Sequence, residues 1–452
     1  MADYQNEREI VLEIIMQVLE EGNPSHIVIR RALDKYDWME ERSKAFISKV
    51  SLATMDHLYR IDGTLDAYSN TPVSKMKPFI RSLLRMSVCQ LLYMEKVPAS
   101  AVCNEAVKLA KAHSFTKLSG FVNGVLRAIA RANDAGSLNC KSAHSGLSLS
   151  YSMPEWIVDI CLESYGRENT EKILKSFTLK EKSRITLSAL KGHTGSEIAQ
   201  MLCEEGVEAE ADADDLKLAH VVGNMNSPAE KRVIREGYAI IQDKSSALAA
   251  DIAAAFAGPV VIDACAAPGG KSMILADRLG NMGTVYSCDI SDYKCNLIRE
   301  NVSRVGLMNV KVLNRDATKL NTAWVEKADL VLADLPCSGL GIMGGKPDIR
   351  YHMTSQKEQE LVKLQRDMLS VLQTYVKPKG VLFYSTCTIH PSENRSMRNW
   401  FLNTYDFEPV DLNQLLPERY RRESASEGFC QLLPGIDDTD GFFFAAFRKK
   451  SV

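Results

Sequence analysis

The chain has 452 residues, of which 45% are hydrophobic and 25% are charged, and its formal net charge is −2. This length and composition predict a soluble globular protein of two or three domains. The first residues lack the pattern of a secretory signal, the longest apolar stretch is interrupted by Asp251, and the eleven cysteines form no CxxC pair, so we expect a cytoplasmic protein without a membrane span or a disulfide framework.

Residues 1–135 are predicted to form an all-α domain. Pro78 opens a run of apolar residues at helical spacing, and Pro98 marks the break after it. The same apolar stripe recurs over residues 100–113 and 121–132, which predicts two further helices. We therefore expect a helical bundle that leaves its charged residues on exposed faces.

A basic block occupies residues 70–131, where ten Lys or Arg are opposed by only two Glu. Such a block on an otherwise neutral chain is typical of a surface that binds a phosphate backbone. A solvated charged face is the alternative that charge alone leaves open. Residues 204–215 show the reverse pattern, with seven acidic residues and no basic one.

The middle of the chain is predicted to contain a linker and a small module. Residues 136–150 are rich in Gly, Ser, Asn and Ala, which is typical of a linker. Residues 151–235 are predicted to form a small α+β, RRM-like module, with a helix near 155–163, a strand near 183–190 and a helix near 196–205.

Residues 236–450 are predicted to form an α/β domain, because short apolar runs alternate there with helical stretches. This alternation favours a parallel, doubly wound, Rossmann-like sheet. The expected strands lie at residues 260–262, 285–286, 310–312, 330–332 and 381–383.

A glycine turn follows the first of these strands, in the segment DACAAPGGKS at residues 263–272. A strand, a glycine turn and a helix together cradle nucleotide-like ligands, because small residues let the backbone come close and the helix N-terminus offers N–H groups. The segment matches neither a P-loop nor GxGxxG. The residues expected to contact a cofactor here are Cys265, Ala266, Ala267, Pro268, Gly269, Gly270 and Lys271.

Acidic residues follow the next two strands. Asp289 ends the second strand, where a carboxylate can accept hydrogen bonds from ribose hydroxyls. Asp316 ends the third strand and is expected to accept from an adenine amino group. The eight histidines never combine with cysteine at metal-ligand spacing, so no metal site is predicted.

Two cysteines follow the last two of the expected strands, Cys337 in DLPCSG and Cys387 in STCT. Both thiols should lie at the carboxyl ends of strands, where open α/β sheets bind ligands. One thiol can then attack a substrate while the other moves a proton. Two buried cysteines that pack as small hydrophobes are the alternative.

These motifs resemble the RNA cytosine-5 methyltransferases of the Sun/nucleolar-protein family, and the helical region resembles the antitermination factor NusB. The first resemblance rests on AAPGGKS, DLPCSG, STCT, IIQDKSS at residues 240–246 and DGFF at residues 440–443. The second rests on RMSVCQLLY at residues 85–93 and FVNGVLR at residues 121–127. Family members usually carry Arg-x-Asn before the middle module, whereas this chain has Arg184-Ile185-Thr186.

The resemblance implies S-adenosylmethionine as the cofactor and 5-methylcytosine in small-subunit (16S) rRNA as the product, with cytosine 967 of the conventional rRNA numbering as the target. It implies the rRNA or a small-subunit assembly intermediate as the partner, and we expect a monomer. Cys387 would be the nucleophile and Cys337 would release the product, while Lys271 and Asp334 would contact the methionine moiety or the base. The residues considered for contact with RNA are Lys75, Lys77, Arg81, Arg127, Arg131, Lys346 and Arg350.

Three other functions remain open at this point. A dinucleotide-dependent oxidoreductase would need the third glycine that the turn lacks. An RNA-binding regulator with an inactive domain would not need both cysteines and an intact cofactor turn. A methyltransferase acting on tRNA would keep the chemistry and change the RNA, and only the NusB-like domain favours rRNA.

Overall fold

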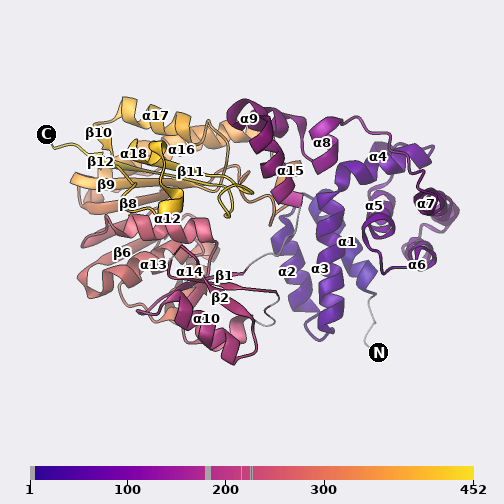
Figure 1. Cartoon of the computed structure of the whole chain (residues 1–452), viewed down its shortest axis with the longest axis horizontal. Coiled ribbons are helices and arrows are strands. Elements are labelled where there is room, and N and C mark those ends of the chain that lie inside the picture. Colours follow the sequence, from indigo (N-terminus) through magenta and orange to yellow (C-terminus); the bar gives the residue numbers. More distant parts are fainter. Residues whose placement is uncertain (1–5, 179–184, 215, 224, 226–227, 452) are drawn as a thin grey trace. The chain divides into compact units, whose positions relative to one another are not determined.

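The computed structural model describes residues 6–178, 185–214, 216–223, 225 and 228–451. The chain divides into two compact units. The first, called here the helical unit, comprises Met1–Leu179 and Met343–Met353; the second, the α/β unit, comprises Lys180–Ile342 and Thr354–Val452 (Figure 1). None of the helices in these described ranges is long and apolar enough to cross a membrane.

The described part of the helical unit is built from α-helices with two short 3-10 turns. The helices predicted after Pro78 and Pro98 and near 121–132 are confirmed as α5, α6 and α7. The full set is α1 (Glu7–Leu19), α2 (Ser25–Lys35), α3 (Glu41–Asp56), α4 (Leu58–Tyr68), η1 (Val73–Lys75), α5 (Pro78–Tyr93), α6 (Ala99–Ala112), η2 (Thr116–Leu118), α7 (Ser119–Asp134), α8 (Gly146–Tyr151), α9 (Glu155–Thr178) and α15 (Ile349–His352).

The core of the helical unit forms where the apolar stripes of these helices meet. On α5 the side chains of Ile80, Leu83, Leu84 and Val88 are all buried, as their spacing along one helical face requires. They join one cluster with apolar residues of α1, α3, α6 and α7. Several basic residues, such as Lys75, Lys77, Arg127 and Arg131, are left on the outer faces.

Two helices extend this unit beyond the predicted linker. Helix α8 packs against α4, and α9 packs against α8, so the helix expected near 155–163 lies in the helical unit and not in the middle module. Inside α9, Gly166 adopts a φ of +72°, which interrupts the regular helix.

The first part of the α/β unit is a four-stranded antiparallel sheet in the order β2-β3-β1-β4. Its strands are β1 (Thr186–Ala189), β2 (Ala209–Ala211), β3 (Leu218–Val221) and β4 (Ala239–Ile241), with α10 (Gly195–Glu204), η3 (Pro228–Glu230) and α11 (Arg232–Arg235) between them. Residues 183 and 184, which open the strand expected there, lie outside the described residues. Helix α10 begins with a capping box of Thr194 and Glu197.

The second part is the predicted doubly wound sheet, and the structure confirms it. Strands β9-β8-β5-β6-β7 are parallel in that order, and β12 adds antiparallel to β9. The elements are α12 (Lys244–Ala254), β5 (Val260–Asp263), α13 (Gly270–Leu279), η4 (Gly280–Met282), β6 (Thr284–Asp289), α14 (Asp292–Val305), β7 (Val310–Asn314), η5 (Thr322–Trp324), β8 (Ala328–Asp334), α16 (Ser355–Tyr375), β9 (Val376–Thr386), α17 (Arg395–Thr404), β10 (Phe407–Pro409), η6 (Glu418–Tyr420), α18 (Glu423–Ser426), β11 (Phe429–Leu432) and β12 (Phe442–Lys449).

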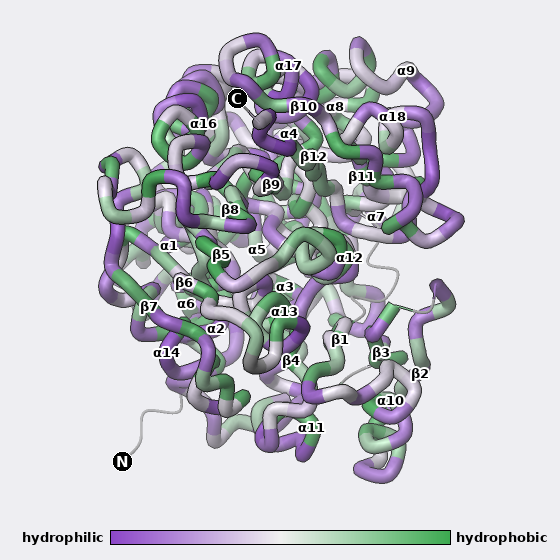
Figure 2. Tube along the Cα trace, turned by 90° about the vertical axis from the view of Figure 1, so that its left-hand side faces the viewer, coloured by the Kyte–Doolittle hydropathy of each residue, from purple (hydrophilic) through white to green (hydrophobic). Residues whose placement is uncertain are grey.

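Both faces of this sheet are covered, as a parallel sheet requires. Val261 packs with residues of α12 and α13 on one face, while its neighbour Ile262 packs with residues of α16 and α17 on the other (Figure 1). This alternation along β5 follows from the two-residue period of a strand. Figure 2 shows hydrophobic stretches on β5 and α12, in keeping with their place inside the unit.

Candidate active site

The candidate site lies at the carboxyl edge of the parallel sheet. Strand β5 pairs with β6 on one side and with β8 on the other, so the chain leaves the centre of the sheet in opposite directions. Such a switch point opens a crevice where doubly wound sheets bind ligands. Asp263, Asp334 and Thr386 are the last residues of β5, β8 and β9, and they bring the predicted motifs to this edge.

The glycine turn has the backbone shape that a close-lying ligand needs. Gly269 is the residue before α13 and adopts a φ of +107°, which favours glycine. A Cβ on Gly269 would lie 3.3 Å from Cγ2 of Ile298, and one on Gly270 would lie 3.2 Å from Cδ of Gln242. The turn is held by the N–H of Ala266, which donates to the carbonyl of Cys288 at 2.8 Å.

Other atoms of the turn are also fixed or protected. The carbonyl of Pro268 accepts a hydrogen bond from Asn301 Nδ2 at 3.0 Å. Cys265 is half-buried, and burial raises the pKa of its thiol, so it stays protonated. Cys265, Ala267 and Pro268 thus belong to the turn itself, while the two other candidate thiols, Cys337 and Cys387, follow the ends of β8 and β9.

The two acids predicted beside the turn have different surroundings. Asp289 is buried at the end of β6, and its Oδ1 accepts from the N–H of Ser291 at 3.1 Å. Asp316 accepts from both the N–H and the hydroxyl of Thr318 at 2.9 and 2.6 Å. These hydrogen bonds lower the pKa of Asp316, and they show that it also stabilises its own turn.

Two buried acceptor atoms beside the glycine turn lack a hydrogen-bond partner among the described residues, namely Oδ1 of Asp263 and Oε1 of Gln242. Burial raises the pKa of Asp263 to about 7, although Ser272 donates to its other oxygen and opposes that effect. Near Asp289, the side chains of Ile290 and Tyr293 are 65% and 70% exposed. Unpaired acceptors and exposed apolar surface fit a ligand that carries N–H groups and a flat base.

An ion pair occupies the space between the glycine turn and β8. Lys271 Nζ lies 2.8 Å from Oδ2 of Asp334, and the hydroxyl of Ser385 donates to Oδ1 of Asp334 at 2.7 Å. Burial acts to lower the pKa of Lys271, but the attraction of Asp334, Asp263 and Cys387 together outweighs it and the pKa is raised. Lys271 therefore keeps its positive charge inside the site, and Cys387 is among the groups that its charge interacts with.

The two predicted cysteines meet at this edge. Sγ of Cys337 lies 3.3 Å from Sγ of Cys387, and both residues are half-buried. The hydrogen bond to Cys387 is the main reason that the pKa of Cys337 is raised, and burial adds to it. Both effects favour the protonated thiol of Cys337. In the hydrogen bond between the two sulfur atoms, either one can be the donor.

The residues considered for RNA contact fall into two groups. Lys75, Lys77, Arg127 and Arg131 are exposed on the helical unit, and Lys346 is half-buried. Arg81 instead forms an ion pair with Glu20 and is largely buried, so its charge is already neutralised within the fold.

Arg350, considered above for contact with RNA, is instead buried in the fold. Its side chain is 0% exposed, and it pairs with Asp56 Oδ1 at 3.3 Å inside the helical unit. It also donates to the carbonyl of Phe177 at 2.9 Å. The sequence conceals this because Asp56 and Arg350 are far apart along the chain, and only folding of the 343–353 segment with the helical unit brings them together.

Sequence reasoning missed a buried polar network behind the two cysteines. Its central residues are Glu393 and Asn394, which follow the STCT motif within a few positions. A buried Glu is rare unless it has partners, but a sequence does not show burial in a loop. The only available signal was the polar dipeptide Glu393-Asn394 so close to a candidate nucleophile.

The fold and the site define a methyltransferase-type domain of the doubly wound class, in which a nucleoside-binding turn faces a pair of thiols. The model of the family described as 16S rRNA methyltransferase RsmB/F matches residues 254–448, and the model of the NusB family matches residues 5–131. The chain belongs to the RsmB/F methyltransferase family, with a NusB-family region ahead of the methyltransferase domain.

Individual proteins show the same relationship over the whole chain. The chain is 32% identical to the probable ribosomal RNA small subunit methyltransferase B of Bacillus subtilis and 28% identical to that of Synechocystis, covering 98% of this chain in both cases and 98% and 99% of those proteins. The crystal structure of PH0851 has a TM-score of 0.83 and 26% identity, covering 99% of this chain and 100% of that one. NSun6 from Pyrococcus horikoshii, solved with SFG, shares the fold over 66% of this chain and 99% of its own, at 19% identity and a TM-score of 0.58.

Proposed function

We propose that this protein uses S-adenosylmethionine to form 5-methylcytosine in small-subunit (16S) rRNA, at the site implied by its family resemblance. The observation that carries the proposal is the pair of thiols 3.3 Å apart beside the Lys271–Asp334 ion pair. The RNA is inferred from the relatives, which are named for the small subunit of the ribosome.

The residues that would hold the cofactor are those of the glycine turn and the acids at the neighbouring strand ends. The N–H groups at the start of α13 and the buried Asp263 would face its polar end, and Asp289 would accept from its ribose hydroxyls. S-adenosylmethionine supplies the methyl group when bound. The remaining chemistry belongs to side chains of this protein.

Cytosine C5 is a poor nucleophile, so a group must first add to C6. Cys387 would form the C6–S bond as a thiolate, which pushes the electron pair of the C5–C6 double bond to C5. The nearby charge of Lys271 favours the thiolate form of Cys387. Asp334, oriented by Lys271 and Ser385, would hold the N3/N4 edge of the base.

Once Cys387 carries the base as a thioether, it is no longer a thiolate, so its hydrogen bond and its charge no longer raise the pKa of Cys337. Cys337 can then lose that proton to solvent and become a base. After C5 has been methylated, Cys337 would take the C5 proton, the C5–C6 double bond would re-form, and the C6–S bond would break. Cys387 leaves as a thiolate and Cys337 is again a thiol, which restores the starting state.

The direct test is methylation of unmodified 16S rRNA, with tRNA as a parallel substrate, followed by mass spectrometry of the released nucleosides. We expect 5-methylcytosine in the 16S rRNA only. Methylation of tRNA instead would change the assigned RNA, and no methylated cytosine in either RNA would overturn the proposal.

Gly269→Ala tests the glycine turn. Alanine at a φ of +107° is strained, and its Cβ presses on Ile298, which costs roughly 1–3 kcal/mol. If this cost falls on the cofactor-bound turn, the Kd for S-adenosylmethionine should rise about tenfold, as measured by calorimetry. Gly206→Ala is the matched control, since Gly206 also has a positive φ of +76° but lies just after the C-terminus of α10, where a Cβ would meet open space. Equal affinity in both variants would contradict the assigned turn.

A groove on the helical unit is the proposed site for the RNA backbone. It has a volume of about 690 Å³ and lies between α6 and α7. Three cations line it, Lys108, Lys111 and Arg127, together with the amides of Asn104 and Asn123 and with Glu105, which forms an ion pair with Lys108 at 2.8 Å. Exposed cations with amide donors suit phosphate and sugar contacts. Of the residues considered above for contact with RNA, Arg127 lines this groove, and Lys108 and Lys111 belong to the same basic block of the sequence.

Replacing Lys111 and Arg127 by glutamine should weaken RNA binding and flatten its salt dependence. Each lost phosphate contact lowers the slope of log K against log salt by about one, so the double variant should lose about two. Fluorescence anisotropy at several salt concentrations measures this slope. Lys35→Gln removes an exposed charge from α2 outside the groove and should leave the slope unchanged. An unchanged slope in the double variant would move the RNA surface elsewhere.

A further inference from the structure

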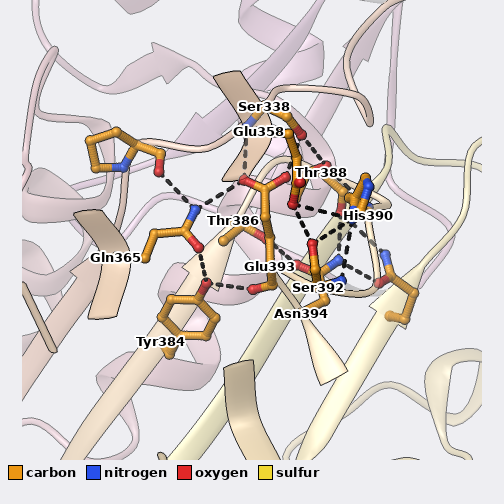
Figure 3. Close-up of polar contacts among 12 residues, drawn as sticks. Ser338, Glu358, Gln365, Tyr384, Thr386, Thr388, His390, Ser392, Glu393 and Asn394 are labelled. Carbon is orange, nitrogen blue, oxygen red and sulfur yellow. Dashed lines mark hydrogen bonds and ion pairs between the residues drawn. The ribbon is translucent and has the colours of Figure 1, made fainter. Parts of the chain in front are cut away.

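The residues behind the two thiols form a connected polar network (Figure 3). At its centre are Glu393, which is 0% exposed, and Asn394, which is 1% exposed. They occupy the loop between β9 and α17, six and seven positions after Cys387. Burial of an ionisable and an amide side chain is costly unless their hydrogen bonds are made, so the partners they have are informative.

Glu393 holds the segment around Cys337. Its carboxylate accepts from the N–H of Ser338 at 2.9 Å and also from the Ser338 hydroxyl. It accepts a third hydrogen bond from Gln365 Nε2 at 3.0 Å, and the same nitrogen donates to the carbonyl of Pro336 at 2.9 Å. Both residues adjacent to Cys337 are therefore fixed, one by Glu393 directly and one through Gln365.

Asn394 holds the segment around Cys387 in the same way. Its Nδ2 donates to the carbonyl of Thr388 at 2.9 Å, and its Oδ1 accepts from the hydroxyl of Thr386 at 2.7 Å. Thr386 and Thr388 are the residues on either side of Cys387. Two neighbouring side chains thus form hydrogen bonds with two cysteine segments that lie fifty positions apart in the sequence.

The Cys337 and Cys387 segments also contact each other directly. The hydroxyl of Ser338 lies 2.7 Å from the hydroxyl of Thr388, so the residue after each cysteine contacts the residue after the other. Tyr384 of β9 completes the support, since its hydroxyl donates to the carbonyl of Glu393 and contacts Gln365. Movement of one cysteine segment relative to the other would break several of these buried bonds.

We propose that Glu393 and Asn394 are positioning residues that together clamp the Cys337 and Cys387 segments and set the separation of their sulfur atoms. Neither touches the reacting atoms. The part of this inference that concerns catalysis rests on the proposed function, whereas the geometry does not. Burial raises the pKa of Glu393, although its hydrogen bonds to Ser338 and Gln365 act to lower it. The side chain is therefore removed from water, and its contacts are with the protein.

The clamp predicts that its loss misplaces the thiols without impairing cofactor binding. Glu393→Gln replaces one acceptor oxygen by a donor that faces the donors of Ser338 and Gln365, and Asn394→Ala removes both contacts to the Cys387 segment. Since a misplacement of about 1 Å can cost about 10²-fold in rate, each variant should lower kcat by about that factor, with KM for S-adenosylmethionine unchanged. Glu358→Gln is the matched control, because Glu358 is also buried in this region but contacts Ser392 and His390 instead.

A second measurement reports the sulfur separation in the protein alone. Diamide takes two electrons and two protons from a thiol pair and leaves a disulfide, and peptide mapping by mass spectrometry follows the Cys337–Cys387 bond among the other cysteines. We expect the wild type and Glu358→Gln to form this bond quickly, and both clamp variants to form it at least about tenfold more slowly, because exchange depends on sulfur access and geometry.

The contact between the Thr388 and Ser338 hydroxyls can be tested with conservative variants of Thr388. Thr388→Val preserves the shape of the side chain but removes its hydroxyl, so it should slow disulfide formation, and Thr388→Ser should restore it. Wild-type rates of disulfide formation in folded Glu393→Gln, Asn394→Ala and Thr388→Val would overturn the clamp. If the wild type forms no 5-methylcytosine, the proposed function fails, while the disulfide rates still decide this inference.

Discussion

Cys387→Ala is expected to abolish methyl transfer, and Cys337→Ala is expected to trap the protein on its RNA. Removing the attacking sulfur should lower the rate by at least about 10⁴-fold, as loss of a catalytic nucleophile does in other enzymes. Cys337→Ala keeps the nucleophile but lacks the group that takes the C5 proton, so the C6–S bond should persist. A slow-migrating protein–RNA band on a denaturing gel, with radiolabelled methyl groups, measures both effects.

Two further variants make this test specific. Cys337→Ala/Cys387→Ala should form no adduct, because the sulfur that bonds to C6 is gone. Cys203→Ala removes an exposed thiol from α10 and should methylate at the wild-type rate. A Cys387→Ala protein that methylates RNA normally would refute the assignment of the nucleophile, and an adduct in the double variant would place the bond on another residue.

Arg350→Met is expected to destabilise the helical unit by about 3–5 kcal/mol, the usual cost of breaking a buried ion pair. The substitution leaves the buried carboxylate of Asp56 without the guanidinium 3.3 Å away, and it removes the donor to the carbonyl of Phe177. Because a protein of several domains need not unfold in one step, the loss should be measured by hydrogen exchange of amides in α3 and α9.

Substitution of the partner residue Asp56 tests whether loss of the ion pair causes this destabilisation. Asp56→Leu combined with Arg350→Met removes both charges, so the double variant should recover part of the loss. Lys346→Met, in the same chain segment but half-buried, should change protection little. If Arg350→Met instead left stability intact and weakened RNA binding, the original prediction of an RNA contact would be right and the buried role wrong.

Local patterns sufficed for most of the secondary structure. Pro78 and Pro98 mark the starts of α5 and α6. Proline suits the start of a helix, and it disfavours helical conformation in the residue before it. The apolar runs at Val261 and Leu330 are neighbouring parallel strands in the structure. They could be predicted because a strand that is buried on both faces has a continuous hydrophobic sequence. The helix near 155 was placed in the wrong unit, because its partner α8 lies within a stretch whose composition resembles a linker.

The sequence by itself determined the doubly wound sheet, the glycine turn and the placing of Cys337 and Cys387 at strand ends, because each depends on a short motif or on a period of a few residues. Only the tertiary structure decided that Arg350 is buried against Asp56, and that Glu393 and Asn394 each hold one cysteine segment. These contacts join residues distant in sequence, and their strength comes from burial, which removes water as the competing partner. Burial is a property of the packed chain and not of any segment of it.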